Sequence, residues 1–144
     1  MPFVGDAPDD SKIADGEILY RRVLDREDMV VHDENLQRWT PRNAALRFDP
    51  DGMSVYLAGV LAERGIGPAQ VAALRTGSIV FSVTAAEARQ EGLGVTHTPA
   101  GPPSDPVAFA HGSICRDPQW SDRELRERRN RLRRRFTLAW GTVS

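Results

Sequence analysis

A cluster of eight arginines near the C-terminus constrains the fold of this chain more than any other feature. These arginines fall within thirteen positions and are Arg123, Arg126, Arg128, Arg129, Arg131, Arg133, Arg134 and Arg135. Ser121 is followed by Glu124 three residues later, which is typical of a helix start, and Gly141 is a residue that ends helices. We therefore expect a basic helix over residues 122–140. Apolar residues at helical spacing predict one stripe that docks on the protein, with the arginines facing water.

The cluster makes the chain electrically asymmetric. Residues 1–122 hold eleven Lys or Arg against eighteen Asp or Glu, whereas residues 123–144 hold eight against two, and together these give a net charge of −1. Such asymmetry indicates either a polyanionic partner or a basic element that docks on its own acidic body. For partner binding we expect the side chains of Arg123, Arg126, Arg131, Arg133, Arg134 and Arg135. An acidic protein surface is the leading partner, nucleic acid is an alternative, and pairing between copies would give a homo-oligomer.

The bulk composition predicts one ordinary domain. A chain of 144 residues with 40% hydrophobic residues can bury a core without disulfides or metals. The single Cys115 excludes an intramolecular disulfide, and the three histidines are too far apart in sequence to predict a metal site. Residues 1–15 are rich in Asp, Pro and Gly, so we expect a flexible acidic arm before a domain over residues 16–144. Without a secretory signal or a stretch long enough to span a membrane, we expect a cytoplasmic protein with no membrane partner. Its eighteen Arg against one Lys are most simply explained by a GC-rich bacterial genome.

Three patterns predict an α+β fold: the alternation of apolar and polar residues typical of strands, residues that cap helices, and turn residues between these elements. Ser54 can cap a helix over residues 55–64, and Gly67 with Pro68 can start a second one, which together would form a helical hairpin. We expect a small, mostly antiparallel sheet covered by this hairpin and by the long amphipathic C-terminal helix. The expected strands are Glu17–Val23, Ala44–Phe48, Ser78–Val83, Gly94–Thr98 and Val107–Ile114.

Three segments in order suggest an enzyme. LYRRV at residues 19–23, QRWTP at 37–41 and MSVYLAG at 53–59 resemble the opening of RES-type domains, which are similar to ADP-ribosyltransferases and consume NAD. The resemblance covers roughly residues 19–63. It implies a dinucleotide cleft built with Arg21 or Arg22, with Arg38 and Trp39, and with Tyr56.

The chemistry of these side chains fits that implication. Arginine can clamp a pyrophosphate, an aromatic ring can stack on nicotinamide, and a carboxylate can stabilise an oxocarbenium-like transition state. His111 follows an apolar run, so it is either a satisfied strand-end histidine or a proton-transfer group. The candidate catalytic residues are thus Arg22, Tyr56 and His111, and the candidate ligand-binding residues are Arg21, Arg38 and Trp39.

Two classes of function therefore remain open. The leading expectation is a small interaction or regulatory module that docks an acidic partner through the basic helix, with no cofactor. The alternatives are an enzyme that takes NAD as its substrate and a protein that binds the backbone of a nucleic acid through the same helix.

Overall fold

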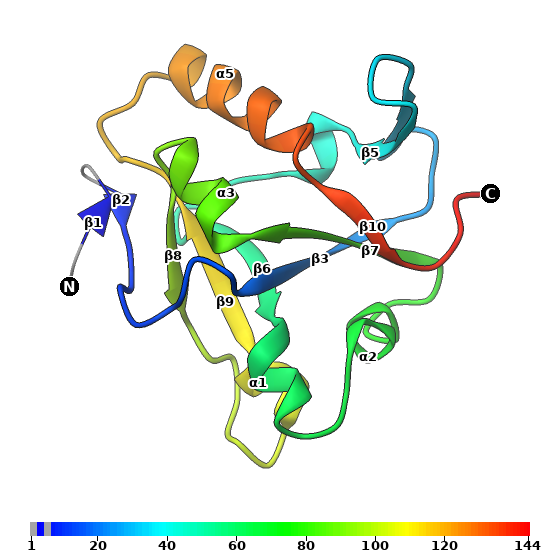
Figure 1. The fold of residues 1–144 in the computed structure, drawn as a ribbon, viewed down its shortest axis with the longest axis vertical. Coiled ribbons are helices and arrows are strands. Elements are labelled where there is room, and N and C mark those ends of the chain that lie inside the picture. Colours follow the sequence, from blue (N-terminus) through cyan, green and yellow to red (C-terminus); the bar gives the residue numbers. More distant parts are fainter. Residues whose placement is uncertain (1–2, 5–6) are drawn as a thin grey trace.

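The computed structural model describes residues 3–4 and 7–144, so part of the expected acidic arm lies outside the described residues. Its centre is a six-stranded sheet, antiparallel at every pairing, with the strand order β10-β7-β3-β6-β9-β8 (Figure 1). These strands are β3 (Ile18–Leu24), β6 (Met53–Leu57), β7 (Ser78–Thr84), β8 (Gly94–His97), β9 (His111–Cys115) and β10 (Thr137–Trp140). The expected α+β fold with an antiparallel sheet is confirmed.

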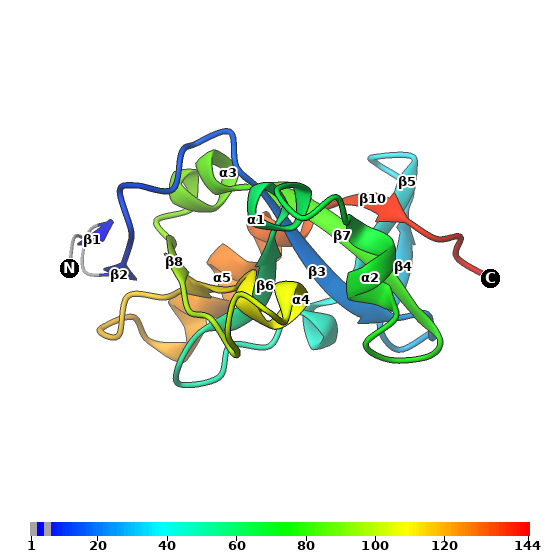
Figure 2. The same cartoon turned by 90° about the horizontal axis from the view of Figure 1, so that it is seen from below.

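Two smaller sheets and several short helices complete the described fold. The small sheets pair β1 (Phe3–Val4) with β2 (Ala7–Pro8) and β4 (Val30–Asp33) with β5 (Arg38–Pro41). The helices are α1 (Ala58–Ala62), α2 (Pro68–Ala72), α3 (Ala85–Gln90), α4 (Pro106–Phe109) and α5 (Asp122–Arg133), with a 3-10 turn η1 at Asn43–Ala45. Figure 2 shows β2 beside β8 at one end of the molecule and β5 beside β10 at the other. No helix among the described residues is long and apolar enough to cross a bilayer.

The core lies on both faces of the central sheet. Along β3, Leu19 and Val23 point into the larger core, which also receives Leu132 of α5 and Phe136. A smaller core on the other face includes Leu61 of α1, together with side chains of α2 and β7. In Figure 1, α5 accordingly lies on one side of the sheet, and α1 and α2 lie on the other. This two-sided packing determines which side chain of each strand remains available for function.

The C-terminal helix is shorter than expected. It begins as predicted, because Ser121 Oγ accepts a hydrogen bond from the backbone N–H of Glu124 at 3.1 Å. It ends at Arg133, however, and residues 137–140 form β10, so the expectation of one helix over 122–140 is wrong. Phe136 is fully buried between the two elements, and the backbone beyond it pairs with β7 instead of continuing the helix.

The described part of the N-terminal arm is anchored. Asp9 is buried, and its Oδ1 accepts hydrogen bonds from Arg89 Nε at 3.0 Å and from the backbone N–H of Val95 at 2.9 Å. An ion pair and contacts with the edge of β8 hold residues 7–15 against the sheet, and the expected flexibility of the arm stays a prediction.

Several other boundaries also differ from the expectations. Three strands are confirmed to within one residue at each end, namely those expected at Glu17–Val23, Ser78–Val83 and Gly94–Thr98. The expected strand at Ala44–Phe48 is wrong, since this stretch holds the end of η1. The expected strand at Val107–Ile114 divides into α4 and β9, because Asp105 caps a helical turn that starts at Pro106. The first helix of the hairpin is reduced to α1, because residues 53–57 form β6 between β3 and β9.

Candidate functional site

A row of polar side chains lies on one face of β9. Residues two apart on a strand share a face, so His111, Ser113 and Cys115 point the same way. His111 Nδ1 lies 2.7 Å from the backbone oxygen of Thr98, and Thr98 Oγ1 shares a 3.0 Å hydrogen bond with Ser113 Oγ. Because a carbonyl oxygen can only accept, Nδ1 carries the hydrogen, and Nε2 of the neutral imidazole is then an acceptor.

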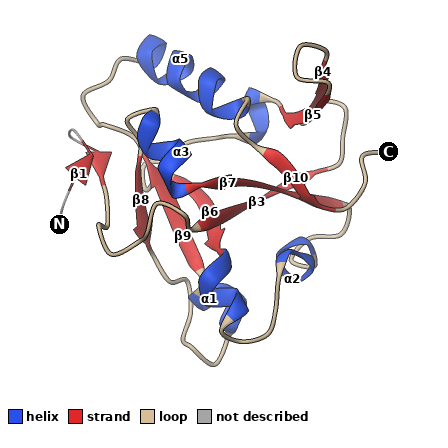
Figure 3. Ribbon diagram, viewed as in Figure 1, coloured by secondary structure: helices blue, strands red, loops and turns tan. Residues whose placement is uncertain are grey.

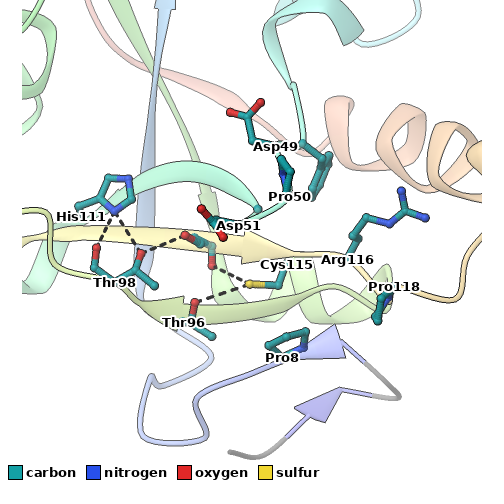
Figure 4. Close-up of a pocket in the computed structure, with 13 residues that line it drawn as sticks. Pro8, Asp49, Pro50, Asp51, Thr96, Thr98, His111, Cys115, Arg116 and Pro118 are labelled. Carbon is teal, nitrogen blue, oxygen red and sulfur yellow. Dashed lines mark hydrogen bonds between the residues drawn. The ribbon is translucent and has the colours of Figure 1, made fainter.

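These side chains form the floor of a cleft of about 820 Å³. Figure 4 shows His111 at one end and Arg116 at the other, with Asp49 and Asp51 on the opposite wall. Apolar side chains complete the lining, namely Pro8, Phe48, Pro50 and Pro118. A mostly apolar cleft of this volume with a few convergent polar groups is typical of a small-molecule site.

The charges of the cleft come from its wall and its far end. Asp49 forms an exposed ion pair with Arg47 at 3.1 Å, and Asp51 is exposed. The guanidinium group of Arg116 donates to two backbone carbonyls, so part of its hydrogen-bonding capacity is already used. Burial raises the pKa of the Cys115 thiol, which therefore remains protonated at neutral pH and is a poor nucleophile.

The same face of the sheet continues from β9 onto β6 and β3, where Tyr56 and Tyr20 pack against the smaller core. The Tyr56 ring meets the His111 ring edge-on, with centroids 5.6 Å apart, and Tyr56 pairs with Tyr20 of β3. Burial raises the pKa of Tyr56, and the positive charges of Arg22 and Arg21 offset this only in part. Arg22 lies two residues beyond Tyr20 and so on the same face. The structure thus brings the three candidate catalytic residues onto adjacent strands of one face.

The side chain of Arg22 is not fully paired. It is half-buried, and its Nε is shielded from water without a hydrogen-bond partner among the described residues. A shielded donor without an acceptor costs free energy, and a ligand acceptor would remove that cost. Arg22 therefore carries one buried donor that the described residues leave unsatisfied, and it is not part of the cleft lining.

Arg21 points to the opposite face and supports the fold. Its Nε and Nη2 donate to the backbone oxygen of Ala45 at 3.1 and 2.9 Å, and its Nη1 donates to that of Ser54 at 2.8 Å. Burial, with help from the neighbouring charge of Arg22, lowers the pKa of Arg21 to about 10, so it remains charged at neutral pH. The protein itself uses these donors, and the ligand-binding role expected for Arg21 stays a prediction.

Arg38 and Trp39 lie away from the cleft. They belong to β5, which pairs with β4 outside the six-stranded sheet and contacts β10 (Figure 3). The Trp39 ring meets His32 edge-on with centroids 5.3 Å apart, and Arg38 Nη2 donates to the backbone oxygen of Arg134 at 2.5 Å. The structure does not place these two residues with Tyr56 and His111, because their hairpin packs at the opposite end of the sheet from β8.

Three arginines of the C-terminal cluster converge on one glutamate. Arg131 Nε donates to Glu91 Oε1 at 2.8 Å, Arg135 Nε donates to Oε2 at 3.0 Å, and Arg128 Nη1 donates to the Glu91 backbone oxygen at 2.8 Å. The Glu91 side chain is only 8% exposed. Burial disfavours its ionisation, but the hydrogen bonds from Arg131 and Arg135 outweigh this and lower its pKa. We call Glu91 with these three arginines the Glu91 clamp.

The other members of the cluster differ in exposure. Arg133 donates to Thr40 Oγ1 at 2.7 Å and is mostly buried. Arg129 is half-buried, and burial lowers its pKa. Arg123, Arg126 and Arg134 are exposed. Of the six arginines expected to bind a partner, Arg131, Arg133 and Arg135 therefore each pair with a group of the protein itself, and Arg131 is exposed as well, so both alternatives that the sequence left open have support.

Comparison with known proteins does not assign the site. No family model matches the chain, and no curated protein or solved structure matches it. Among the described residues, no three His, Cys, Asp or Glu side chains are grouped so that they could hold a metal ion.

Sequence reasoning missed several residues of the cleft. Asp49 and Asp51 are not among the residues expected to bind or react, and the sequence carries no signal that they line a cleft with β9. Thr98 was assigned to the end of a strand without a functional role. His111 and Ser113 lie two residues apart within the strand expected over residues 107–114, so their shared face was a usable signal.

Proposed function

We propose that this chain binds a small organic ligand in the cleft and along the face of the sheet that adjoins the cleft at His111. The observation that carries this proposal is that the cleft and the strand face with the candidate catalytic residues meet at His111. Arg22, Tyr56 and His111 share one face of adjacent strands, and His111 also lines the cleft of about 820 Å³. The Glu91 clamp supports the same choice, because it reduces the basic surface that the alternative function requires.

We further propose NAD as the ligand and hydrolysis of its glycosidic bond to nicotinamide as the reaction. The resemblance to RES-type domains favours this ligand at Arg22 and Tyr56, although it loses the support of Arg38 and Trp39. Water would attack the ribose C1′ as the C–N bond breaks, with the bond electrons going to the departing nicotinamide. His111 Nε2 would take the proton from the water, and the products are ADP-ribose, nicotinamide and a proton.

The other side chains have matching roles in this proposal. The guanidinium group of Arg22 would pair with a phosphate oxygen, since Arg binds phosphates in a forked geometry. The carboxylates of Asp49 and Asp51 would stabilise positive charge that develops on the ribose. Thr98 would hold His111 in the tautomer that leaves Nε2 as the acceptor.

Nicotinamide release from NAD, followed by chromatography, tests the reaction. His111→Gln should lower kcat by about 100-fold or more, and Arg22→Met should weaken NAD binding measured by calorimetry. His32→Gln is the matched control, because His32 lies on β4 outside the cleft. The proposal fails if the wild-type protein neither binds nor cleaves NAD, or if His111→Gln and His32→Gln behave alike.

A second candidate function remains the docking of an acidic protein surface. The observation that favours it is the exposure of Arg123, Arg126 and Arg134, which would still attract a negatively charged partner. Changing all three to Glu should abolish retention on an immobilised acidic peptide at low salt. Retention that survives this change would refute docking through α5. Stronger retention on DNA than on the peptide would favour nucleic acid as the partner instead.

A further inference from the structure

The strand β10 forms one edge of the central sheet. It pairs with β7 on one side, and no described strand pairs with its other side. All four of its residues are exposed. An edge strand leaves backbone donors and acceptors that another extended chain can bind, and proteins usually protect such edges with charged residues or proline. The sequence TLAW of β10 has neither, and its protection consists of a register shift between Leu138 and Trp140 and of contacts with β5 and α2.

Exposed apolar side chains gather around this edge. Leu138 and Trp140 of β10 are 37% and 42% exposed, and Trp39 of the neighbouring β5 is 37% exposed. Leu74, just after α2, is 50% exposed, and α2 also contacts β10. Ile18 is the remaining large apolar side chain that is exposed among the described residues. Such concentration around an open edge indicates an interface.

The charges at the two ends of β10 favour a second copy as the occupant. Exposed Arg134 lies before the strand. Beyond the strand, the carboxylate of Asp25 accepts hydrogen bonds from the backbone N–H and Oγ of Ser144 at 3.1 and 2.8 Å. In an antiparallel pair of β10 strands, the Arg134 end of each copy lies beside the Asp25 end of the other. A parallel pair would bring the two Arg134 side chains together.

We propose that two copies of this chain dimerise through antiparallel pairing of their β10 strands. The two six-stranded sheets then form one continuous sheet, and Leu138 and Trp140 pack at the seam. Backbone hydrogen bonds supply affinity, and the two symmetric Arg134–Asp25 pairs set the direction. This interface lies at the opposite end of the sheet from the cleft, so it is independent of the proposed ligand.

Sedimentation equilibrium of the purified chain tests the dimer. The wild-type protein should have twice the chain mass of 16.0 kDa, and the double variant Leu138→Lys/Trp140→Lys should have the mass of one chain. Ile18→Lys is the matched control, because Ile18 and Trp140 are equally exposed and Ile18 lies on β3. The control should remain dimeric. A monomeric wild-type protein at several hundred micromolar, or equal effects of the control and the double variant, would overturn the proposal.

Exchanging the charges of Arg134 and Asp25 tests whether the two β10 strands pair antiparallel. These variants leave Leu138 and Trp140 unchanged. Arg134→Glu and Asp25→Arg should each raise the dimer dissociation constant by about tenfold at low salt. The double variant Arg134→Glu/Asp25→Arg should restore it to within about threefold of the wild-type value. If the dissociation constant of the double variant rises by the product of the two single effects, antiparallel pairing is overturned. Nicotinamide release by each variant should stay at the wild-type level, which separates this proposal from the proposed function.

Discussion

Removal of Glu91 should destabilise the protein through loss of the Glu91 clamp. The carboxylate accepts two charge-assisted hydrogen bonds, from Arg131 at 2.8 Å and from Arg135 at 3.0 Å. Such bonds contribute about 1.5–3 kcal/mol each in protected settings. The side chains of Arg131 and Arg135 are 53% and 31% exposed, so water partly replaces the lost acceptor. We therefore expect Glu91→Ala to lower the unfolding free energy by about 2–3 kcal/mol and Tm by about 5–10 °C.

The clamp also predicts a dependence on pH. The pKa of Glu91 is lowered in the folded protein, so its contribution to stability is complete above its unfolded pKa and is lost as pH falls through its folded pKa. The difference in unfolding free energy between wild type and Glu91→Gln should therefore be largest near neutral pH. It should narrow as the solution is acidified below the model-compound value of 4.5.

Urea unfolding followed by tryptophan fluorescence at a series of pH values measures both effects. Glu63→Gln is the control, because Glu63 is exposed on the surface and its substitution should change the unfolding free energy by less than about 0.5 kcal/mol. A loss in Glu91→Ala no larger than in this control would refute the reasoning. If the difference in unfolding free energy between wild type and Glu91→Gln stays constant between pH 7 and pH 3.5, the ionised carboxylate of Glu91 is not the cause of the stabilisation.

Three further predictions follow from buried groups. Arg21→Met should lower the unfolding free energy by about 2–4 kcal/mol in thermal or urea unfolding, because it leaves the Ala45 carbonyl without its donor. Gly94→Ala should speed hydrogen exchange and proteolysis near Pro8, because the added Cβ would lie 1.8 Å from the Pro8 oxygen; unchanged exchange would contradict this contact. Cys115 should react with a thiol reagent slowly in the folded protein and rapidly in urea, since the native thiol is buried and its pKa is raised.

Locally encoded elements were predictable from the sequence. The helix α3 begins at a capping box that is visible in the sequence, Thr84 with Glu87 three residues later, and Glu87 N donates to Thr84 Oγ1 at 3.2 Å. Ser78–Val83 was recognised because its alternating apolar side chains match a strand. Both signals involve residues close together in the sequence, so tertiary contacts were not needed to interpret them.

Elements that depend on distant partners were not predictable. Residues 53–57 have apolar spacing compatible with a helix, and they form β6 because β3 and β9 lie on either side. Ala139 and Trp140 also fit the apolar stripe of a longer helix, and pairing with β7 decided in favour of a strand. The end of α5 could not be located without knowing that β7 offered an open edge.

The candidate site was predictable only in part, for the same reason. Arg22, Tyr56 and His111 were named from the sequence, and antiparallel pairing brings them to one face. The sequence could not show that the turn containing Asp51 would form the facing wall of the cleft. Nor could it show that Trp39 would lie on a separate hairpin.

The alternation of β3 gives its two adjacent arginines different consequences for the protein. Arg21 donates hydrogen bonds to the backbone of both η1 and β6 on one face of the sheet. On the opposite face, the Nε of Arg22 has no hydrogen-bond partner among the described residues. Loss of Arg21 should reduce how much folded protein a cell accumulates, and loss of Arg22 should leave that amount unchanged while weakening the NAD binding that we propose. A variant that replaces both arginines would lose folded protein and ligand binding together. Each arginine must therefore be changed alone to separate the two effects.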